Sequence, residues 1–212
     1  MGRREQAQQS RAALVDAARS CFTESGYEGT TVAAILDRAG MARGALYHYF
    51  PDGKREIFTA VFEQADDAFH ERRDALLEIA SPLARIRNGM RVFLELCTRD
   101  DFARIVLIDA PKIVPGQGDL GSTYELLREQ LAMAIAAGEI EPCDPEVTAI
   151  ALHGAARRAG EYVVASKQRR RASARAIRSM ELMIDGLAAV ETRARTPRRS
   201  GRVAVRPARR VD

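Results

Sequence analysis

Within seven positions, residues 43 to 49 bring together an arginine, a glycine, a histidine and two tyrosines: Arg43, Gly44, Tyr47, His48 and Tyr49. A guanidinium can donate two hydrogen bonds to the edge of a guanine, and hydroxyl groups can donate to phosphates. Glycine has no side chain and permits close approach to a partner. These residues predict a helix whose exposed face contacts DNA, with Arg43 on either a base or a phosphate.

Two short helices, predicted over residues 32–39 and 43–49, must hold these side chains in place. A turn containing Gly40 joins them, and neither helix is long enough to be stable alone, as in a helix-turn-helix. Apolar residues at helical spacing would pack the pair on a preceding helix: Ile35, Leu36, Ala39, Leu46 and Phe50. Thr31 stands where it would cap the first short helix, whose N-terminus would favour phosphate. Lys54 follows the turn at 51–53 and is a further candidate for a phosphate contact.

The remaining sequence also has helical periodicity. A first helix is predicted from Leu14, Ala17, Ala18, Cys21 and Phe22, which share one face, and Gly26 would end it. No run alternates as strands do, so we predict an all-α fold of about nine helices. The predicted organisation is a flexible basic arm over 1–10, a three-helix helix-turn-helix domain over 11–55, and a larger helical ligand-binding and dimerisation domain over 56–192. An Arg-rich tail over 193–212 is predicted to be disordered.

Residues 11 to 58 resemble the DNA-binding domain of the TetR family of transcriptional regulators. The resemblance is carried by residues 12–22, by 26–32 and by 39–50, which reads AGMARGALYHYF. It implies a homodimer on a palindromic operator, released when a small-molecule effector binds the C-terminal helices. A regulator without an effector, or an activator, is compatible with the same fold. The DNA contacts that the resemblance implies are Thr31, Arg43, Gly44, Tyr47, His48, Tyr49 and Lys54.

Beyond residue 60 the candidate residues are aromatic or polar side chains near apolar helical faces. Such residues can line a small-molecule cavity, and the candidates are Phe93, Cys97, Phe102, Tyr124, Arg128, His153 and Arg157. An inward-facing Arg128 or Arg157 would favour an anionic effector. Small and apolar residues of the last two helices are candidates for a dimer interface, with the core of a single chain as the alternative: Gly154, Ala155, Ala159, Gly160, Ile177, Met180, Ile184 and Leu187.

One motif suggests a different function. Residues 116–121 read GQGDLG, which fits the GxGxxG of dinucleotide-binding proteins, and the apolar run 105–108 precedes it. That motif needs a strand before it and neighbouring βαβ units, which the helical pattern does not supply. An NAD-dependent oxidoreductase is therefore a remote alternative. No catalytic grouping, cofactor site or metal-ligand spacing emerges, and we predict that the protein is not an enzyme.

The basic character of the chain is confined to its end. The net charge is +4, but residues 193–212 carry eight arginines against one acid, so residues 1–192 are net acidic. A constitutive DNA-binding protein that uses this tail as its main contact is a further alternative. No apolar run approaches about 18 residues, and the start of the chain lacks a secretory signal pattern. We therefore expect a cytoplasmic protein that binds no membrane.

Overall fold

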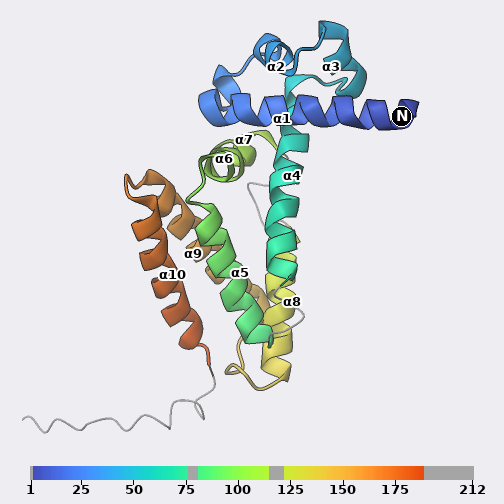
Figure 1. The fold of residues 1–212 in the computed structure, drawn as a ribbon. Coiled ribbons are helices and arrows are strands. Elements are labelled where there is room, and N and C mark those ends of the chain that lie inside the picture. Colours follow the sequence, from blue (N-terminus) through green and yellow to red (C-terminus); the bar gives the residue numbers. More distant parts are fainter. Residues whose placement is uncertain (1, 76–80, 115–121, 189–212) are drawn as a thin grey trace, which may run out of the picture.

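The computed structural model describes residues 2–75, 81–114 and 122–188, and these fold almost entirely into helices (Figure 1). In chain order the elements are α1 (Arg3–Gly29), α2 (Val32–Ala39), α3 (Arg43–Tyr49), α4 (Lys54–Asp74), α5 (Pro82–Leu96), α6 (Asp100–Phe102), the π-helix η1 (Ala103–Asp109), α7 (Ala110–Ile113), α8 (Ser122–Ala136), α9 (Pro145–Ala165) and α10 (Arg169–Asp185). Because α6, η1 and α7 run on without a break, these ranges form nine helical stretches, which confirms the predicted all-α fold. No strand forms in them.

The helical assignment also decides between the two functions that the sequence suggested. The apolar run 105–108, which would have been the strand before the GxGxxG motif, lies inside η1. The motif itself, at 116–121, lies outside the described residues, as does the Arg-rich tail. Without a strand before the motif the βαβ unit cannot be built, so the oxidoreductase alternative is wrong.

The first three helices pack as a unit across the end of α4 (Figure 1). Their core is made of fully buried side chains, among them Leu14, Phe22, Ile35, Leu46 and Phe58. The expected arm over residues 1–10 is different in the structure, because α1 extends back to Arg3. No apolar side chain precedes Leu14 in that core, so the first turns of α1 project beyond the three-helix unit.

The two short helices begin and end as their sequences predict. The Thr31 hydroxyl accepts a hydrogen bond from the Ala34 backbone N–H at 3.1 Å, which caps α2. Gly40 ends α2 in the left-handed conformation, with φ of 65°. The residue before α3 is Ala42, which provides no side-chain cap. The position of α3 therefore depends on packing, through Leu46 and Phe50.

The chain has two apolar cores that share one helix. The first includes the N-terminal turns of α4, through Ile57, Phe58 and Val61, while Phe69 further along the same helix belongs to the second. The second core lies among α5, α8, α9 and α10, of which α5 packs against the lower part of α4 while α10 lies on the far side of α5 (Figure 1). The predicted boundary at residue 55 therefore does not separate the two cores, because the continuous helix α4 contributes residues to both of them.

Candidate functional site

The face of α3 that points away from the core carries the predicted polar residues. Arg43, Gly44, Tyr47 and His48 are exposed, and 44% of the Tyr47 surface is accessible. Tyr49 is half-buried, and its ring meets His48 edge to face at 4.9 Å between centroids. A short exposed helix with a guanidinium at its first turn and a phenol one turn later has the dimensions and donors for a DNA groove.

Lys54, another predicted DNA contact, has partners within the chain. Its ammonium donates hydrogen bonds to the carbonyl oxygens of Tyr27, at 2.9 Å, and Thr30, at 3.1 Å. It also lies over the Tyr27 ring, 4.3 Å from the centroid. These carbonyls end α1 and carry the negative pole of its dipole. Lys54 thus binds the end of α1, and its phosphate contact stays a prediction.

We expect Lys54→Met to lower the free energy of unfolding by about 1–2 kcal/mol, because two charge-assisted hydrogen bonds and a cation–π contact are lost. Urea denaturation followed by circular dichroism measures this. Arg55→Met is the matched control, since Arg55 is the exposed neighbour of Lys54. Equal stability of the two variants would contradict the role given to Lys54.

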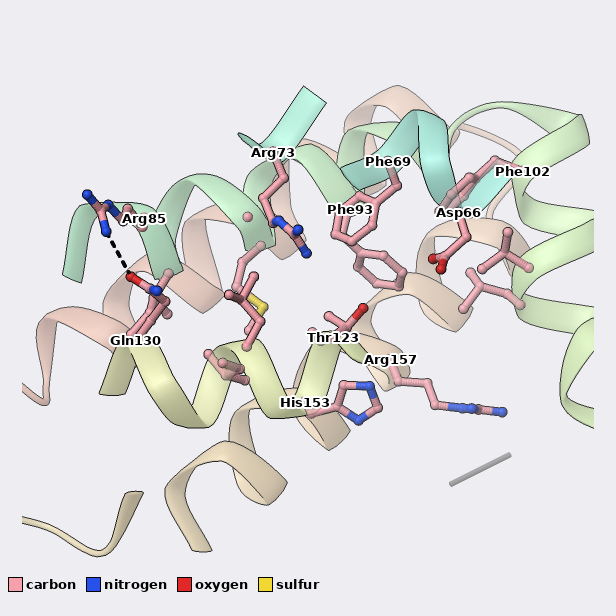
Figure 2. A pocket seen from close by; sticks show the side chains of 18 of the residues that line it. Asp66, Phe69, Arg73, Arg85, Phe93, Phe102, Thr123, Gln130, His153 and Arg157 are labelled. Atoms are coloured by element: carbon pink, nitrogen blue, oxygen red, sulfur yellow. Dashed lines mark hydrogen bonds between the residues drawn. The ribbon is translucent and has the colours of Figure 1, made fainter. Parts of the chain in front are cut away.

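A cavity of about 140 Å³ opens between α4, α5, η1, α8 and α9 (Figure 2). Its wall is mostly apolar and aromatic, with several charged or polar side chains among the lining residues: Asp66, Arg73, Arg85, Thr123, Gln130, His153 and Arg157. Arg85 donates to the Gln130 amide oxygen at 3.5 Å. An apolar cavity with a few polar groups is the usual form of a small-molecule site.

Four of the seven predicted cavity residues line it: Phe93, Phe102, His153 and Arg157. The other three do not. Cys97 is buried behind the wall, where burial raises its pKa to about 12, and its Sγ lies against Gly160. Tyr124 is buried outside the cavity lining. Arg128 pairs with Glu125 on the surface of α8, at 3.0 Å.

The sequence analysis missed Asp66 and Arg73, although α4 contained a signal for them. Phe62, Asp66, Phe69 and Arg73 follow one helical stripe at i, i+4, i+7 and i+11. Charged residues on an otherwise apolar stripe indicate that the face meets something other than a dry core. All four line the cavity.

The π-helix η1 connects the cavity wall to the three-helix unit. Val106 and Leu107 line the cavity, while Ile105 belongs to the first core. The buried carboxylate of Asp109 accepts a hydrogen bond from the Tyr27 backbone N–H at 2.9 Å and another from Arg104 Nε at 3.1 Å. The five-residue spacing of Arg104 and Asp109 matches the wider turn of a π-helix. One element therefore contacts both the cavity and the end of α1.

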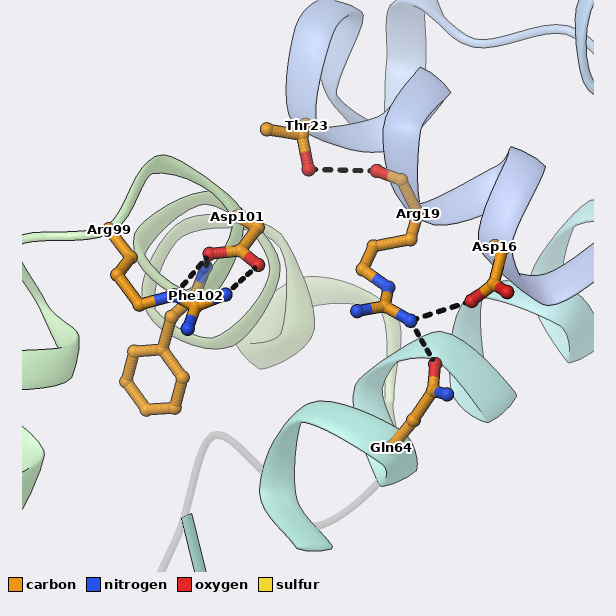
Figure 3. Close-up of polar contacts among 7 residues, drawn as sticks. All are labelled: Asp16, Arg19, Thr23, Gln64, Arg99, Asp101 and Phe102. Atoms are coloured by element: carbon orange, nitrogen blue, oxygen red, sulfur yellow. Dashed lines mark hydrogen bonds and ion pairs between the residues drawn. The ribbon is translucent and has the colours of Figure 1, made fainter. Parts of the chain in front are cut away.

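A second polar contact joins the same parts of the molecule (Figure 3). Arg19 of α1 donates to the Gln64 side chain of α4 at 2.9 Å and to Asp16 at 2.7 Å. Asp101 of α6 bonds Arg99, which lowers the pKa of the Asp101 carboxyl, and Arg19 adds to that effect from across the junction. The Arg19–Gln64 hydrogen bond therefore joins α1 to α4, and Arg19 interacts with α6 only electrostatically.

Three of the eight candidate dimer residues are buried in the core of the chain, four are partly buried against it, and one is exposed. Met180 and Ile184 are buried there, and Gly160 is close-packed against Phe93 and Cys97. Ala155, Ala159, Ile177 and Leu187 pack against the same core, and only Gly154 of the eight is exposed. The apolar side chains that do face outward on α9 and α10 are different ones: Val147, Ile150, Tyr162, Leu182 and Met183.

The described ranges contain neither a membrane-spanning helix nor a metal-binding cluster. No helix within the described ranges is long and apolar enough to span a bilayer. In those same ranges no three histidine, cysteine, aspartate or glutamate side chains gather as a metal site would require.

Comparison with known proteins assigns both halves of the chain. Residues 14–61 match the family model described as bacterial regulatory proteins of the tetR family, and residues 83–187 match a tetracyclin repressor-like C-terminal domain. The chain therefore belongs to the TetR family, whose members are DNA-binding transcriptional regulators and not enzymes.

Individual relatives agree with this assignment. The HTH-type transcriptional regulator RutR of Escherichia coli K12 is 30% identical over 141 residues, which cover 63% of this chain and 66% of RutR, just under two thirds of its length. A TetR-family regulator from Pectobacterium atrosepticum has a similar structure, with a TM-score of 0.72 and 28% identity over 89% of this chain and 98% of that one. AibR, solved with isovaleryl coenzyme A and operator DNA, gives a TM-score of 0.63 at 22% identity, over 84% of this chain and 98% of AibR.

Proposed function

We propose that this regulator is a cytoplasmic repressor, a homodimer that holds a palindromic operator through α3 of each subunit and releases it when a small molecule fills the cavity. The observation that supports this most directly is the position of η1, which supplies both the cavity wall and the Asp109 contact to α1. A change in the cavity must move η1 or α4 before it can reach α3. AibR, which has a similar fold, was solved in complex with isovaleryl coenzyme A and operator DNA, which supports a fold that binds both a small molecule and DNA.

The proposed release depends on the spacing of the two recognition helices. Successive major grooves on one face of DNA recur about every 34 Å, and both α3 helices must match that spacing at once. A ligand favours the released state only by the difference between its affinities for the two states. The experiment is fluorescence anisotropy on the duplex that the protein selects from random DNA, with and without a cavity ligand. Unchanged operator affinity at saturating ligand would contradict the release mechanism.

The dimer is proposed to form through the outer faces of α9 and α10. Val147, Ile150 and Tyr162 are exposed at helical spacing on α9, and Leu182 is exposed on α10. Arg175 of α10 lies over the Tyr162 ring, 5.9 Å from its centroid, so the two faces adjoin. Large apolar side chains exposed together favour burial against a partner, and a second copy presents the same face for a two-fold contact.

We expect Leu182→Asp to convert the dimer to a monomer, because a charge at this apolar contact must be desolvated without a partner. Light scattering coupled to size-exclusion chromatography measures the mass. Met133→Asp is the matched control, since Met133 is a similarly exposed apolar residue on α8. A Leu182→Asp protein that remains dimeric would place the interface elsewhere.

A further inference from the structure

The charged groups of the cavity are mainly basic. Arg73, Arg85 and Arg157 line it, against the single acid Asp66 among the described lining residues. Burial and the nearby Arg157 lower the pKa of His153, which keeps that imidazole neutral near pH 7. The lining is thus more basic than acidic, although Arg73 and Arg157 also pair with Asp74 and Glu161, which lie outside it.

Arg73 is the cation best placed to bind a ligand. Its side chain is only 13% exposed, compared with 31% for Arg157. Its present partner is the adjacent Asp74, at 2.7 Å, whose side chain is 51% exposed and does not line the cavity. Because water screens the Asp74 side of this pair, it is weak. A carboxylate inside the apolar cavity would form a stronger, charge-assisted pair with Arg73.

The apolar part of the cavity wall is rich in aromatic side chains. Phe69, Phe93 and Phe102 form a series of edge-to-face contacts, with centroids 6.2 and 6.1 Å apart. Figure 2 shows the Phe93 ring projecting between the Arg73 guanidinium and the Asp66 carboxylate. Aromatic walls favour aromatic guests at such distances. A cavity near 140 Å³ is comparable with cavities that hold one benzene.

Asp66 lies two turns before Arg73 on the same face of α4, close enough for Arg73 to act electrostatically on its carboxyl. The two residues are seven apart on α4, which is about 10 Å along the helix axis. Burial raises the pKa of Asp66, so neutralising this carboxyl costs less than usual.

We propose that the cavity binds a compact aromatic carboxylate, with its carboxylate on Arg73 and its ring against Phe93. This rests on the proposed role of the cavity as the effector site and names the class of effector. Arg73 lies near the C-terminal end of α4, and Lys54 lies at its start. A ligand that binds Arg73 therefore contacts the same helix on which the DNA-binding unit packs.

The test compares three probes of nearly the same shape and different charge: benzoate, benzamide and benzamidine. Isothermal titration of the full-length protein gives their dissociation constants, and a ligand of about nine non-hydrogen atoms binds in the millimolar range. We expect benzoate to bind about tenfold more tightly than benzamide, as one charge-assisted hydrogen-bonded pair provides, and benzamidine to bind least. In Arg73→Leu the advantage of benzoate should disappear, whereas Arg72→Leu, at the exposed neighbouring position, should keep it.

Equal binding of benzoate and benzamide by the unaltered protein would overturn the proposal, as would no binding of benzoate up to about 20 mM. So would a preference for benzoate that survives Arg73→Leu. These outcomes are independent of DNA. If benzoate binds through Arg73 but leaves operator affinity unchanged, the ligand class stands and the release mechanism proposed above fails.

Discussion

The substitution Arg43→Ala should lower the affinity for the selected operator duplex at least about thirtyfold, while leaving the thermal midpoint of unfolding unchanged. Arg43 occupies the first position of α3, is exposed, and forms no ion pair or hydrogen bond among the described residues. Its guanidinium is therefore available to DNA. A bidentate contact to guanine is worth about 1–3 kcal/mol of binding free energy per site, and a dimer would lose this amount twice. Fluorescence anisotropy at fixed salt measures the change.

The control for Arg43→Ala is Arg38→Ala on the preceding helix. Arg38 is also an exposed arginine, but both of its terminal nitrogens donate to Glu24, at 2.7 and 2.8 Å. Held in that way, it should contribute less than about threefold, through long-range attraction alone. The salt dependence then separates the two possible roles of Arg43: a phosphate contact lowers the slope, and a base contact relaxes the sequence preference at one position. Equal losses in both variants would remove Arg43 from the binding face.

The substitution Gly26→Ala should lower the free energy of unfolding by about 2–4 kcal/mol. Gly26 breaks α1 with φ of 70° and ψ of 175°, a conformation that side chains avoid and that costs about 1–3 kcal/mol. An added Cβ would also lie 1.6 Å from a terminal nitrogen of Arg104. Arg104 can move, but only by leaving Asp109, whose carboxylate also accepts from Tyr27. The substitution therefore strains the backbone and disturbs the junction between the DNA-binding unit and the cavity.

Chemical denaturation of the Gly26→Ala protein measures this loss, and two further variants test its cause. Gly44→Ala should be neutral or stabilising by up to about 1 kcal/mol, because it adds a methyl group in open space on a helix. Combining Gly26→Ala with Arg104→Ala removes the clash but not the backbone strain, so it should recover less than half of the lost stability. A Gly26→Ala protein as stable as the Gly44→Ala protein would show that the junction tolerates a continuous helix.

The DNA-binding unit was predictable from sequence because its determinants are local. Thr31, Gly40 and Ala42 each act on the next few residues, and Leu46 and Phe50 place α3 by simple periodicity. The contact of Lys54 with the end of α1 was not predictable, because its partners, the carbonyls of Tyr27 and Thr30, reach it only through the break at Gly26. That contact joins residues 27 and 24 positions apart, and no local pattern encodes it.

The cavity and the dimer face were less predictable for a related reason. Periodicity tells which face of a helix is buried, but not whether that face meets a core, a cavity or a second chain. Cys97 and Phe93 are four residues apart on one face, yet only Phe93 reaches the cavity. Met180 and Leu182 are both apolar, and only the three-dimensional packing places one inside and the other outside. The π-helix η1 likewise has no sequence signature that separates it from an α-helix.

The most direct measurement is the affinity of the full-length protein for the duplex it selects, compared with a shuffled duplex of the same composition at about 150 mM salt. A dimer that reads bases through α3 should prefer the selected duplex by at least about a thousandfold, and Arg43→Ala should remove most of that preference. Equal affinity for the two duplexes, falling steeply with salt in both cases, would contradict the account, because binding would then come from charge alone.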